Sequence, residues 1–299
     1  MRSKLFVPGI RTDLFAKAVA SPADAISFDL EDSVIDSRKA EARTNVAAFL
    51  KSSFLKSSGA AGRGKTIIVR SNALDTADFE ADILGVMQPS LDMINLPKVQ
   101  SAEDICTAVE IIERAEKAND VTRPVGILAT IESPRGLRLA AEIAAAHPRV
   151  TGLQLGLNDL FETLAIDRRD ANNIHTALFA MRLAAGEAGI FAYDGAYTDM
   201  GDQRGFRAEA EMAHRLGYMG KSCIHPCQIL PANEVFSPSE EEIAFALQVL
   251  KKSRSAAADG VGVFMVDGKM IDLPIIRRAE AVIAMSKHMP EDRHHDTAD

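Results

Sequence analysis

The stretch GILATIESPRGL, residues 126–137, contains the unit from which we expect the fold to be built. Residues 126–131 are apolar except for Thr130, and a nearly continuous apolar run is typical of a parallel strand that is covered on both faces. The run ends on a carboxylate, Glu132, after which SPRGL opens a helical segment. The stretch therefore predicts a buried strand that presents Glu132 at its C-terminal end.

Strand-like runs of this kind occur eight times in the first three-quarters of the chain, with helical segments between them. Regular alternation of strand and helix predicts an α/β fold, and eight repeats predict a (β/α)8 TIM barrel, with a doubly wound open sheet as the alternative. The strand-like runs are residues 4–7, 24–29, 65–70, 92–97, 125–132, 151–156, 189–194 and 217–225. The helical segments are residues 13–20, 37–53, 73–87, 101–118, 136–146, 172–188 and 203–216.

The alternation stops before the end of the chain. We therefore expect a catalytic barrel domain of residues 1–235 and a C-terminal helical extension of residues 236–299 that serves as a lid. Helical periodicity predicts two helices in the extension, at 240–254 and at about 275–287. The last ten residues, PEDRHHDTAD, have almost no apolar side chains to bury, and we expect a frayed tail from about residue 289.

The composition excludes several classes of protein. With 299 residues and 47% apolar side chains, the chain is long enough for one large globular domain. A formal net charge of −8 argues against binding to nucleic acid, which requires Lys and Arg gathered on one face. No apolar run reaches the roughly 18 residues that a membrane span needs, and the N-terminus does not resemble a signal peptide, so we expect a soluble cytoplasmic protein.

The three cysteines, Cys106, Cys223 and Cys227, cannot form a disulfide framework, and an odd number suits a reducing compartment. The segment CIHPC at 223–227 could suggest zinc, but a structural zinc site needs four ligands in paired clusters. We interpret these cysteines as small packing residues.

Charged residues follow the apolar runs at the C-terminal strand ends, where a barrel of this kind carries its chemistry. Carboxylates gathered there raise one another's pKa, and a divalent cation would relieve their repulsion. Glu132 and Asp159 follow successive strands and offer the hard oxygen ligands that Mg²⁺ accepts, together with substrate oxygens and waters. The strand-end residues are Asp29, Glu31, Asp32, Arg70, Glu132, Asp159 and Asp194.

These residues also have structural interpretations, which the sequence leaves open. Glu132 could cap the helix that SPRGL opens, and Asp159 could cap the helix that opens at LFETL. Arg70 ends a core strand, and its planar fork suits bidentate recognition of a substrate carboxylate. Arg70 could equally pair with the acidic cluster at 29–32, alongside or in place of that role.

Eight ordered motifs resemble one protein family. They are KLFVPG, ISFDLEDSV, IIVRSN, LPKV, ATIESPRGL, LQLGLNDL, GKSCIHPCQI and GKMIDLP. From about residue 2 to 285 the chain is similar to the HpcH/HpaI aldolase and citrate lyase β-subunit family, which includes malyl-CoA and citramalyl-CoA lyases. The resemblance implies a Mg²⁺-dependent barrel enzyme that cleaves or forms a carbon–carbon bond beside a thioester carbonyl.

The resemblance also implies roles for individual residues. Glu132 and Asp159 would bind Mg²⁺, and Arg70 would bind the carboxylate end of the substrate. Members form oligomers, so we expect a homotrimer or hexamer in which Asp272 acts as acid or base in a neighbouring subunit's site. Alternatively, Asp272 could be the N-cap of the last helix, with Pro274 at an early helical position.

Two further groups of residues are expected to support the reaction. Glu31, Asp32 and Asp194 would orient metal-bound waters. Coenzyme A would bring phosphates to an acidic chain, and residues 2–17 supply local positive charge, with four basic residues against Asp13. The basic residues of that segment are Arg2, Lys4, Arg11 and Lys17.

The sequence thus favours a lyase that cleaves a β-hydroxy acyl-CoA, such as malyl-CoA or citramalyl-CoA, into a keto acid and acetyl-CoA by retro-Claisen or aldol chemistry. One alternative is a citrate lyase β subunit that acts on a thioester carried by an acyl-carrier protein. Another is an aldolase that acts on free pyruvate. A non-enzymatic paralogue that binds Mg²⁺ or acyl-CoA is least favoured, because Arg70, Glu132 and Asp159 are all present.

Overall fold

The computed structural model describes residues 1–52, 65–258 and 260–286. Contacts divide the chain into two units, residues 1–236 and 237–299. The tail that we expect from about residue 289 lies outside the described residues. In the described part of the chain, no helix combines the length and apolarity that crossing a membrane requires.

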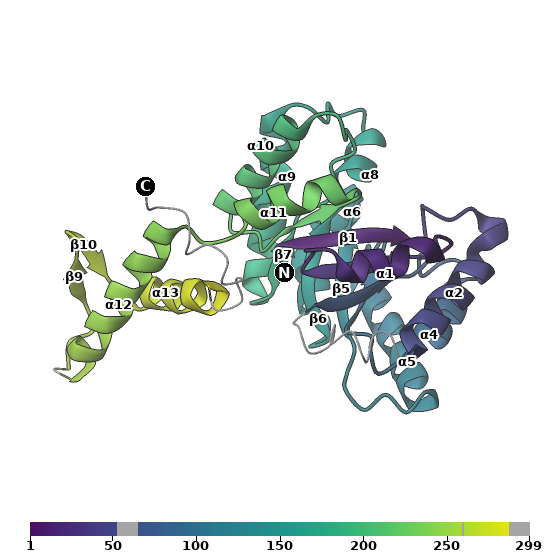
Figure 1. Ribbon diagram of the computed structural model, residues 1–299. Coiled ribbons are helices and arrows are strands. Elements are labelled where there is room, and N and C mark those ends of the chain that lie inside the picture. The colour runs from purple at the N-terminus through teal and green to yellow at the C-terminus, as the bar shows by residue number, and fades with distance from the viewer. Residues whose placement is uncertain (53–64, 259, 287–299) are drawn as a thin grey trace. The chain divides into compact units, whose positions relative to one another are not determined.

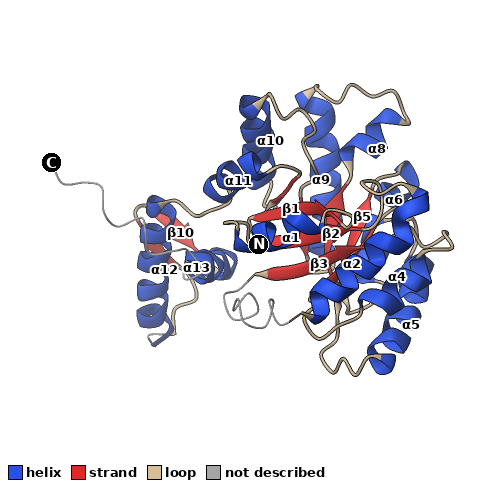
Figure 2. Cartoon of the chain, turned by 45° about the vertical axis from the view of Figure 1, so that its right-hand side comes forward, coloured by secondary structure: helices blue, strands red, loops and turns tan. Residues whose placement is uncertain are grey.

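The first unit is built around eight parallel strands (Figures 1 and 2). They are β1 (Ser3–Pro8), β2 (Ala25–Asp29), β3 (Thr66–Arg70), β4 (Met93–Leu96), β5 (Gly126–Ile131), β6 (Val150–Leu155), β7 (Phe191–Tyr193) and β8 (Lys221–Cys223). Their order around the sheet is β7-β6-β5-β4-β3-β2-β1-β8. Each predicted run overlaps one of these strands.

The sheet closes on itself between the end of β7 and strand β8. The amide N–H of Asp194 donates to the carbonyl of Gly220 over 2.9 Å, and the N–H of Ser222 donates to the carbonyl of Asp194 over 3.0 Å. Closure confirms the predicted TIM barrel and shows that the open-sheet alternative is wrong, because an open sheet would leave these strands unpaired.

Helices follow the strands and cover the outside of the barrel (Figure 2). They are α1 (Thr12–Ala20), α2 (Lys39–Lys51), α4 (Phe79–Val86), α5 (Ala102–Ala118), α6 (Pro134–Arg138), α7 (Ala140–Ala145), α8 (Leu157–Glu162), α9 (Ala171–Glu187), α10 (Gln203–Arg215) and α11 (Ile229–Val235). Short 3₁₀ turns occupy Asp36–Arg38 and Pro226–Gln228.

Two predicted helices differ from those observed. The helix expected at 73–87 begins only at Phe79, because Thr76 turns the chain by donating from its N–H and its hydroxyl to the carbonyl of Ala73, over 3.0 and 2.7 Å. The segment expected to form one helix at 136–146 is divided into α6 and α7 at Leu139. In both places a local turn overrides a helical composition.

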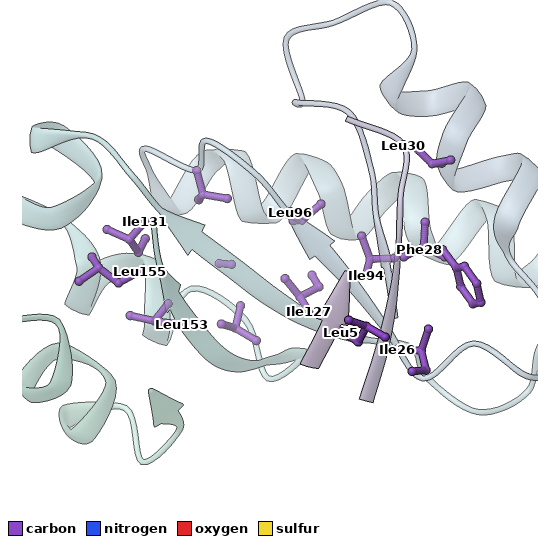
Figure 3. Close-up of a cluster of buried hydrophobic side chains, with 14 of the residues drawn as sticks. Leu5, Ile26, Phe28, Leu30, Ile94, Leu96, Ile127, Ile131, Leu153 and Leu155 are labelled. Carbon is purple, nitrogen blue, oxygen red and sulfur yellow. The ribbon is translucent and has the colours of Figure 1, made fainter. Parts of the chain in front are cut away.

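The strands carry different side chains on their two faces. Aliphatic and aromatic residues such as Leu5, Ile26, Phe28 and Ile94 belong to the large core between the strands and the helices (Figure 3). The alternate residues face the barrel interior, and several of them are buried and polar. These interior polar residues are Lys4, Ser27, Asn95, Thr130 and Gln154. The inner face therefore combines these polar residues with a small apolar cluster that includes Ile68, Met93 and Leu128.

The second unit has a small core of its own. It contains α12 (Glu240–Ala258), the antiparallel strands β9 (Phe264–Val266) and β10 (Lys269–Ile271), and α13 (Leu273–Ser286). The buried residues of this core are Ala246, Val249, Val266, Ile271, Ala279 and Val282. Both predicted helices are present, and a hairpin that the sequence analysis did not predict lies between them.

Candidate active site

A pocket of about 410 Å³ opens at the C-terminal ends of the barrel strands. Residues on or directly after β1, β2, β3, β5 and β6 line it, together with the segments that follow β7 and β8. Arg70, Glu132 and Asp159 all lie in its wall. The structure therefore brings the three residues with the central predicted roles into one cavity.

Glu132 directly follows β5 and is only 8% exposed. Its Oε1 accepts a hydrogen bond from the backbone N–H of Lys98 over 2.6 Å. A Cβ at Gly156 would come within 2.6 Å of Glu132 Oε2, so the absence of a side chain at Gly156 lets the end of β6 approach the carboxylate. Burial, followed by the negative charges of Glu31 and Asp159, raises the pKa of Glu132 to about 8.

Neither Glu132 nor Asp159 caps a helix. The cap of α6 is Ser133, whose hydroxyl accepts from the N–H of Gly136 over 3.0 Å. Asp159 lies in the first turn of α8, whose start at Gly156 has no side-chain cap. Neither residue therefore occupies a cap position, although Asp159 is an acidic residue in the first turn of α8, and both residues line the pocket.

Arg70 is held by three carboxylates. Asp29 is its cross-strand partner in the register of β2 and β3, and the two oxygens of Asp29 accept from Arg70 Nε and Nη2 over 2.7 and 2.8 Å. Nη1 lies 2.9 Å from Glu31 Oε2 and 3.1 Å from Asp32 Oδ2. The pairing interpretation is thus confirmed, and Arg70 nevertheless lines the pocket.

These contacts shift the titration of the buried acids in opposite directions. Burial raises the pKa of Asp29, but the charge and hydrogen bonds of Arg70 outweigh it and leave the pKa below its ordinary value. Burial dominates at Glu31 and raises its pKa. The Arg70 guanidinium therefore holds Asp29 as an anion and compensates Glu31 only in part.

Lys98 connects the two acidic groups of the site. It follows β4 with a left-handed φ of 56°, and this conformation turns its N–H toward Glu132. Its Nζ lies 2.8 Å from Glu31 Oε1. Lys98 belongs to the LPKV motif but has no predicted role; the signal that could have revealed it is a cation immediately after a strand end.

Residues 2–226 match the HpcH/HpaI aldolase/citrate lyase family. The chain belongs to this family. Aldolases and citrate lyases both break carbon–carbon bonds, and membership of the HpcH/HpaI aldolase/citrate lyase family makes this protein a carbon–carbon lyase.

Curated relatives cover almost the whole chain. The citrate lyase subunit beta of Escherichia coli is 36% identical over 288 residues, which are 96% of this chain and 93% of that one. The L-malyl-CoA/beta-methylmalyl-CoA lyase of Cereibacter sphaeroides is 34% identical over 308 residues, 96% of this chain and 94% of the relative. Among solved structures, CitE from Mycobacterium tuberculosis in complex with magnesium, acetoacetate and coenzyme A is 30% identical, with a TM-score of 0.72 over 96% of this chain and 100% of that one.

Two of the basic residues predicted to contact coenzyme A phosphates are placed where they cannot do so. Arg2 precedes β1, at the end of the barrel opposite the pocket, and donates to Asp24 from Nε and Nη2 over 2.9 and 2.8 Å. Lys4 is completely buried inside the barrel. Arg11 and Lys17 are exposed on the segment that follows β1, and they remain candidates.

Asp194 does not reach the pocket. Its carboxylate is fully buried and lies 2.6 Å from Nζ of Lys221, which also lies 2.6 Å from Glu209. The prediction that Asp194 orients metal-bound waters therefore fails, because Lys221 already neutralises it. Lys221 has no predicted role, although a lysine within a strand-like run is a signal of a buried charge.

Asp272 lies in the second unit, where it caps α13. Its Oδ1 accepts from the N–H of Ile275 over 3.4 Å, and its backbone carbonyl accepts from Ile276 over 3.1 Å. The N-cap interpretation is confirmed. The role of Asp272 in a neighbouring subunit's site stays a prediction.

Proposed function

We propose that this protein is a Mg²⁺-dependent lyase that cleaves a β-hydroxy acyl-CoA of the malyl-CoA or citramalyl-CoA type into a keto acid and acetyl-CoA. The observation that carries the proposal is the pair of carboxylates, Glu132 and Asp159, in the same pocket as the Arg70 guanidinium. Two similar proteins support it. The relative from Cereibacter sphaeroides is an L-malyl-CoA/beta-methylmalyl-CoA lyase, and the CitE structure from Mycobacterium tuberculosis contains magnesium and coenzyme A.

The chemistry of the two carboxylates fits Mg²⁺. Burial beside other acids raises the pKa of Glu132, and a bound cation would lower it again. In the described ranges no three His, Cys, Asp or Glu side chains form a complete cage. Mg²⁺ usually accepts one or two protein carboxylates and fills its octahedron with substrate oxygens and waters, as Glu132 and Asp159 would allow. We assign Glu31 and Asp32 the role of orienting those waters.

Each step of the cleavage needs a group at a defined place. Bound Mg²⁺ would act as a Lewis acid that stabilises negative charge on substrate oxygen. A base removes the β-hydroxyl proton, the carbon–carbon bond breaks, its electrons pass to the thioester fragment, and an acid protonates that carbon to give acetyl-CoA. Asp272 of a neighbouring subunit is our candidate for the proton transfer.

Arg70 would orient the substrate's carboxylate. Its partner Asp32 is 56% exposed, whereas Asp29 and Glu31 are buried, so Asp32 is the partner that a substrate carboxylate can replace. Exchanging one carboxylate for another keeps the charge around Arg70 balanced. For the coenzyme A phosphates we retain Arg11 and Lys17, which are exposed after β1.

Release of acetyl-CoA from malyl-CoA or citramalyl-CoA should require Mg²⁺. We expect EDTA to abolish release and excess Mg²⁺ to restore it, because the two pocket carboxylates bind the metal that polarises the substrate. The assay is acetyl-CoA formation, with thermal unfolding in Mg²⁺ as a separate measure of metal binding. Undiminished cleavage in EDTA, or no cleavage although Mg²⁺ stabilises the protein, would contradict the proposal.

Mixed oligomers test the role that we propose for Asp272. Asp272→Asn and Glu132→Gln should each be inactive alone. If Asp272 serves a neighbour's site, co-expression of the two variants should restore about a quarter of wild-type activity. In a random mixture, about a quarter of the sites combine an intact Glu132 from one subunit with an intact Asp272 from its neighbour. The measurement is acetyl-CoA release by the co-purified mixture. No recovery despite mixed oligomers would place Asp272 outside the neighbour's chemistry.

A second candidate is a citrate lyase β subunit. The 36% identity to the Escherichia coli subunit is the observation that favours it. Such a protein would act on a thioester carried by an acyl-carrier protein and would purify in a stable multi-protein complex. Cleavage of the carrier-bound thioester, without cleavage of any free acyl-CoA, would establish this candidate over the first.

A further inference from the structure

A chain of buried charges beside the pocket has no part in the proposed mechanism. Lys221 of β8 is fully buried, and its Nζ lies 2.6 Å from Asp194 Oδ2 and 2.6 Å from Oε1 of Glu209, which belongs to α10. Glu209 also accepts from Nη1 and Nη2 of Arg168, over 2.7 and 3.0 Å. Arg168 lies in the loop between α8 and α9. Two cations and two acids thus connect the closure of the barrel with this loop.

The charges in this chain balance one another. Burial raises the pKa of Glu209, but Lys221 and Arg168 outweigh it and leave the pKa below its ordinary value. Glu209 is therefore an anion that binds both cations. Because desolvation largely offsets the attraction between buried charges, such a group contributes little to stability as a whole. What it does provide is a fixed position for the Arg168 guanidinium.

The third nitrogen of Arg168 bonds to the wall of the pocket. Nε donates to Asn158 Oδ1 over 3.0 Å. Asn158 is the second residue of α8 and directly precedes Asp159, and both residues line the pocket. Since Glu209 binds the two terminal nitrogens in a bidentate pair, the guanidinium plane is fixed and Nε is directed at Asn158.

The bond between Arg168 and Asn158 is the polar contact that fixes the first turn of α8. This helix has only six residues, and its start at Gly156 carries no side-chain cap. In the described part of the chain, Arg168 is the only residue outside 156–163 whose side chain hydrogen-bonds to α8. The Asp159 carboxylate is exposed and, within the described ranges, accepts no hydrogen bond of its own. Its direction therefore follows the turn that Asn158 anchors.

We propose that Arg168 is a positioning residue for the metal site, and that through Asn158 it holds the first turn of α8 so that the Asp159 carboxylate is presented to Mg²⁺. This inference rests on the proposed function and extends it to the buried charges beside the pocket. Residues that orient metal ligands typically account for roughly 10- to 100-fold in metal affinity, and we expect an effect of that size.

Binding of Mg²⁺ to the full-length protein tests the inference without chemistry. In calorimetric titrations with MgCl₂, Arg168→Met and Asn158→Leu should each raise the Kd about 10-fold or more. Asn158→Leu is the sharper variant, because it removes the last bond and leaves the pairing of Arg168 with Glu209 in place. The double variant should match the weaker single variant within about twofold, because both changes break the same link.

Two controls separate positioning from folding. Arg207→Met removes a cation of α10 that pairs with Glu234 at the surface, and its Kd for Mg²⁺ should stay within about twofold of the wild type. In EDTA, Asn158→Leu should unfold at about the same denaturant concentration as the wild type. A loss of Mg²⁺ affinity in this variant then reports the position of the ligand and not the loss of the fold.

Three results would overturn the inference while the proposed function stands. They are an unchanged Kd in Asn158→Leu, a marked loss of its stability in EDTA, and a double variant in which the two single effects multiply. A wild type that does not bind Mg²⁺ would overturn the proposed function together with the inference.

Discussion

Glu132→Gln should lower acetyl-CoA release at least ~1,000-fold, because loss of a metal ligand removes several kcal/mol of charge stabilisation in the transition state. The change is nearly isosteric, and the side-chain oxygen can still accept from the N–H of Lys98. The fold should therefore persist. Glu142→Gln, at an exposed position on α7, is the matched control and should retain full activity.

The same substitution should stabilise the metal-free protein. Folded Glu132 keeps its proton up to about pH 8, whereas the unfolded chain releases it near 4.5. Between these values the folded state binds more protons, so stability falls as pH rises, by on the order of 3 kcal/mol at pH 7. Glutamine does not titrate, so this fall in stability with pH should be absent from the variant.

Chemical unfolding in EDTA at pH 5 and pH 8 measures this effect. The Glu132→Gln variant should be more stable than the wild type at pH 8 and about equal to it at pH 5. Mg²⁺ at pH 8 should then stabilise the wild type and leave the variant unchanged. Two results would show that Glu132 does not carry the buried charge of the metal site. One is equal stability of the wild type and the variant at pH 8 in EDTA, and the other is an increase in the variant's stability when Mg²⁺ is added.

Arg70→Met should destabilise the protein by roughly 3–5 kcal/mol, because Asp29 and Glu31 would remain buried without their cation. Activity should also be lost, because the substrate's carboxylate would have no partner. Arg70→Lys retains the charge but cannot span three carboxylates, so we expect a smaller loss of stability and a similar loss of activity.

The loss of stability in Arg70→Met should depend on pH. In the wild type, Asp29 has a lowered pKa and contributes stability that is present above its ordinary pKa and lost as pH falls. Without Arg70, only the N–H groups of Glu31 and Ser33 oppose the effect of burial on Asp29, so its pKa should rise. The deficit should therefore be largest near neutral pH and shrink toward pH 4. Denaturant titrations at both pH values measure it.

A surface arginine provides the comparison. Arg114 pairs with Glu80 over 2.8 Å, and both side chains are more than half exposed. Arg114→Met should therefore cost only about 0–1 kcal/mol. A deficit for Arg70→Met no larger than that of Arg114→Met would show that Arg70 does not hold the acidic cluster together.

Much of the fold and part of the site follow from short-range patterns. Apolar runs and helical segments lie close together in the sequence, and their alternation identifies the barrel without knowledge of any contact. The C-terminal strand ends then meet at one rim, so Arg70, Glu132 and Asp159 could be selected by position alone. Whether Glu132 is a helix cap or a pocket residue could not be decided from the sequence. The structure decides it, because the cap of α6 is Ser133.

The basic residues near the N-terminus show where sequence reasoning stops. Arg2, Lys4 and Arg11 lie within a few positions of one another, yet one is at the opposite end of the barrel, one is inside it and one is exposed beyond β1. A net local charge does not distinguish these environments, because successive residues of a strand point in opposite directions and its two ends lie at opposite rims.

By itself the sequence determined the order of strands and helices and the carboxylates and arginine at their ends, because these depend on neighbours along the chain. Only the tertiary structure decided which buried polar groups meet. Lys4, Asn95 and Gln154 come from strands that are not adjacent, and Lys4 reaches the other two only because the sheet closes. Closure is a long-range event, and the partners that it creates inside the barrel have no signature in the local pattern of any one strand.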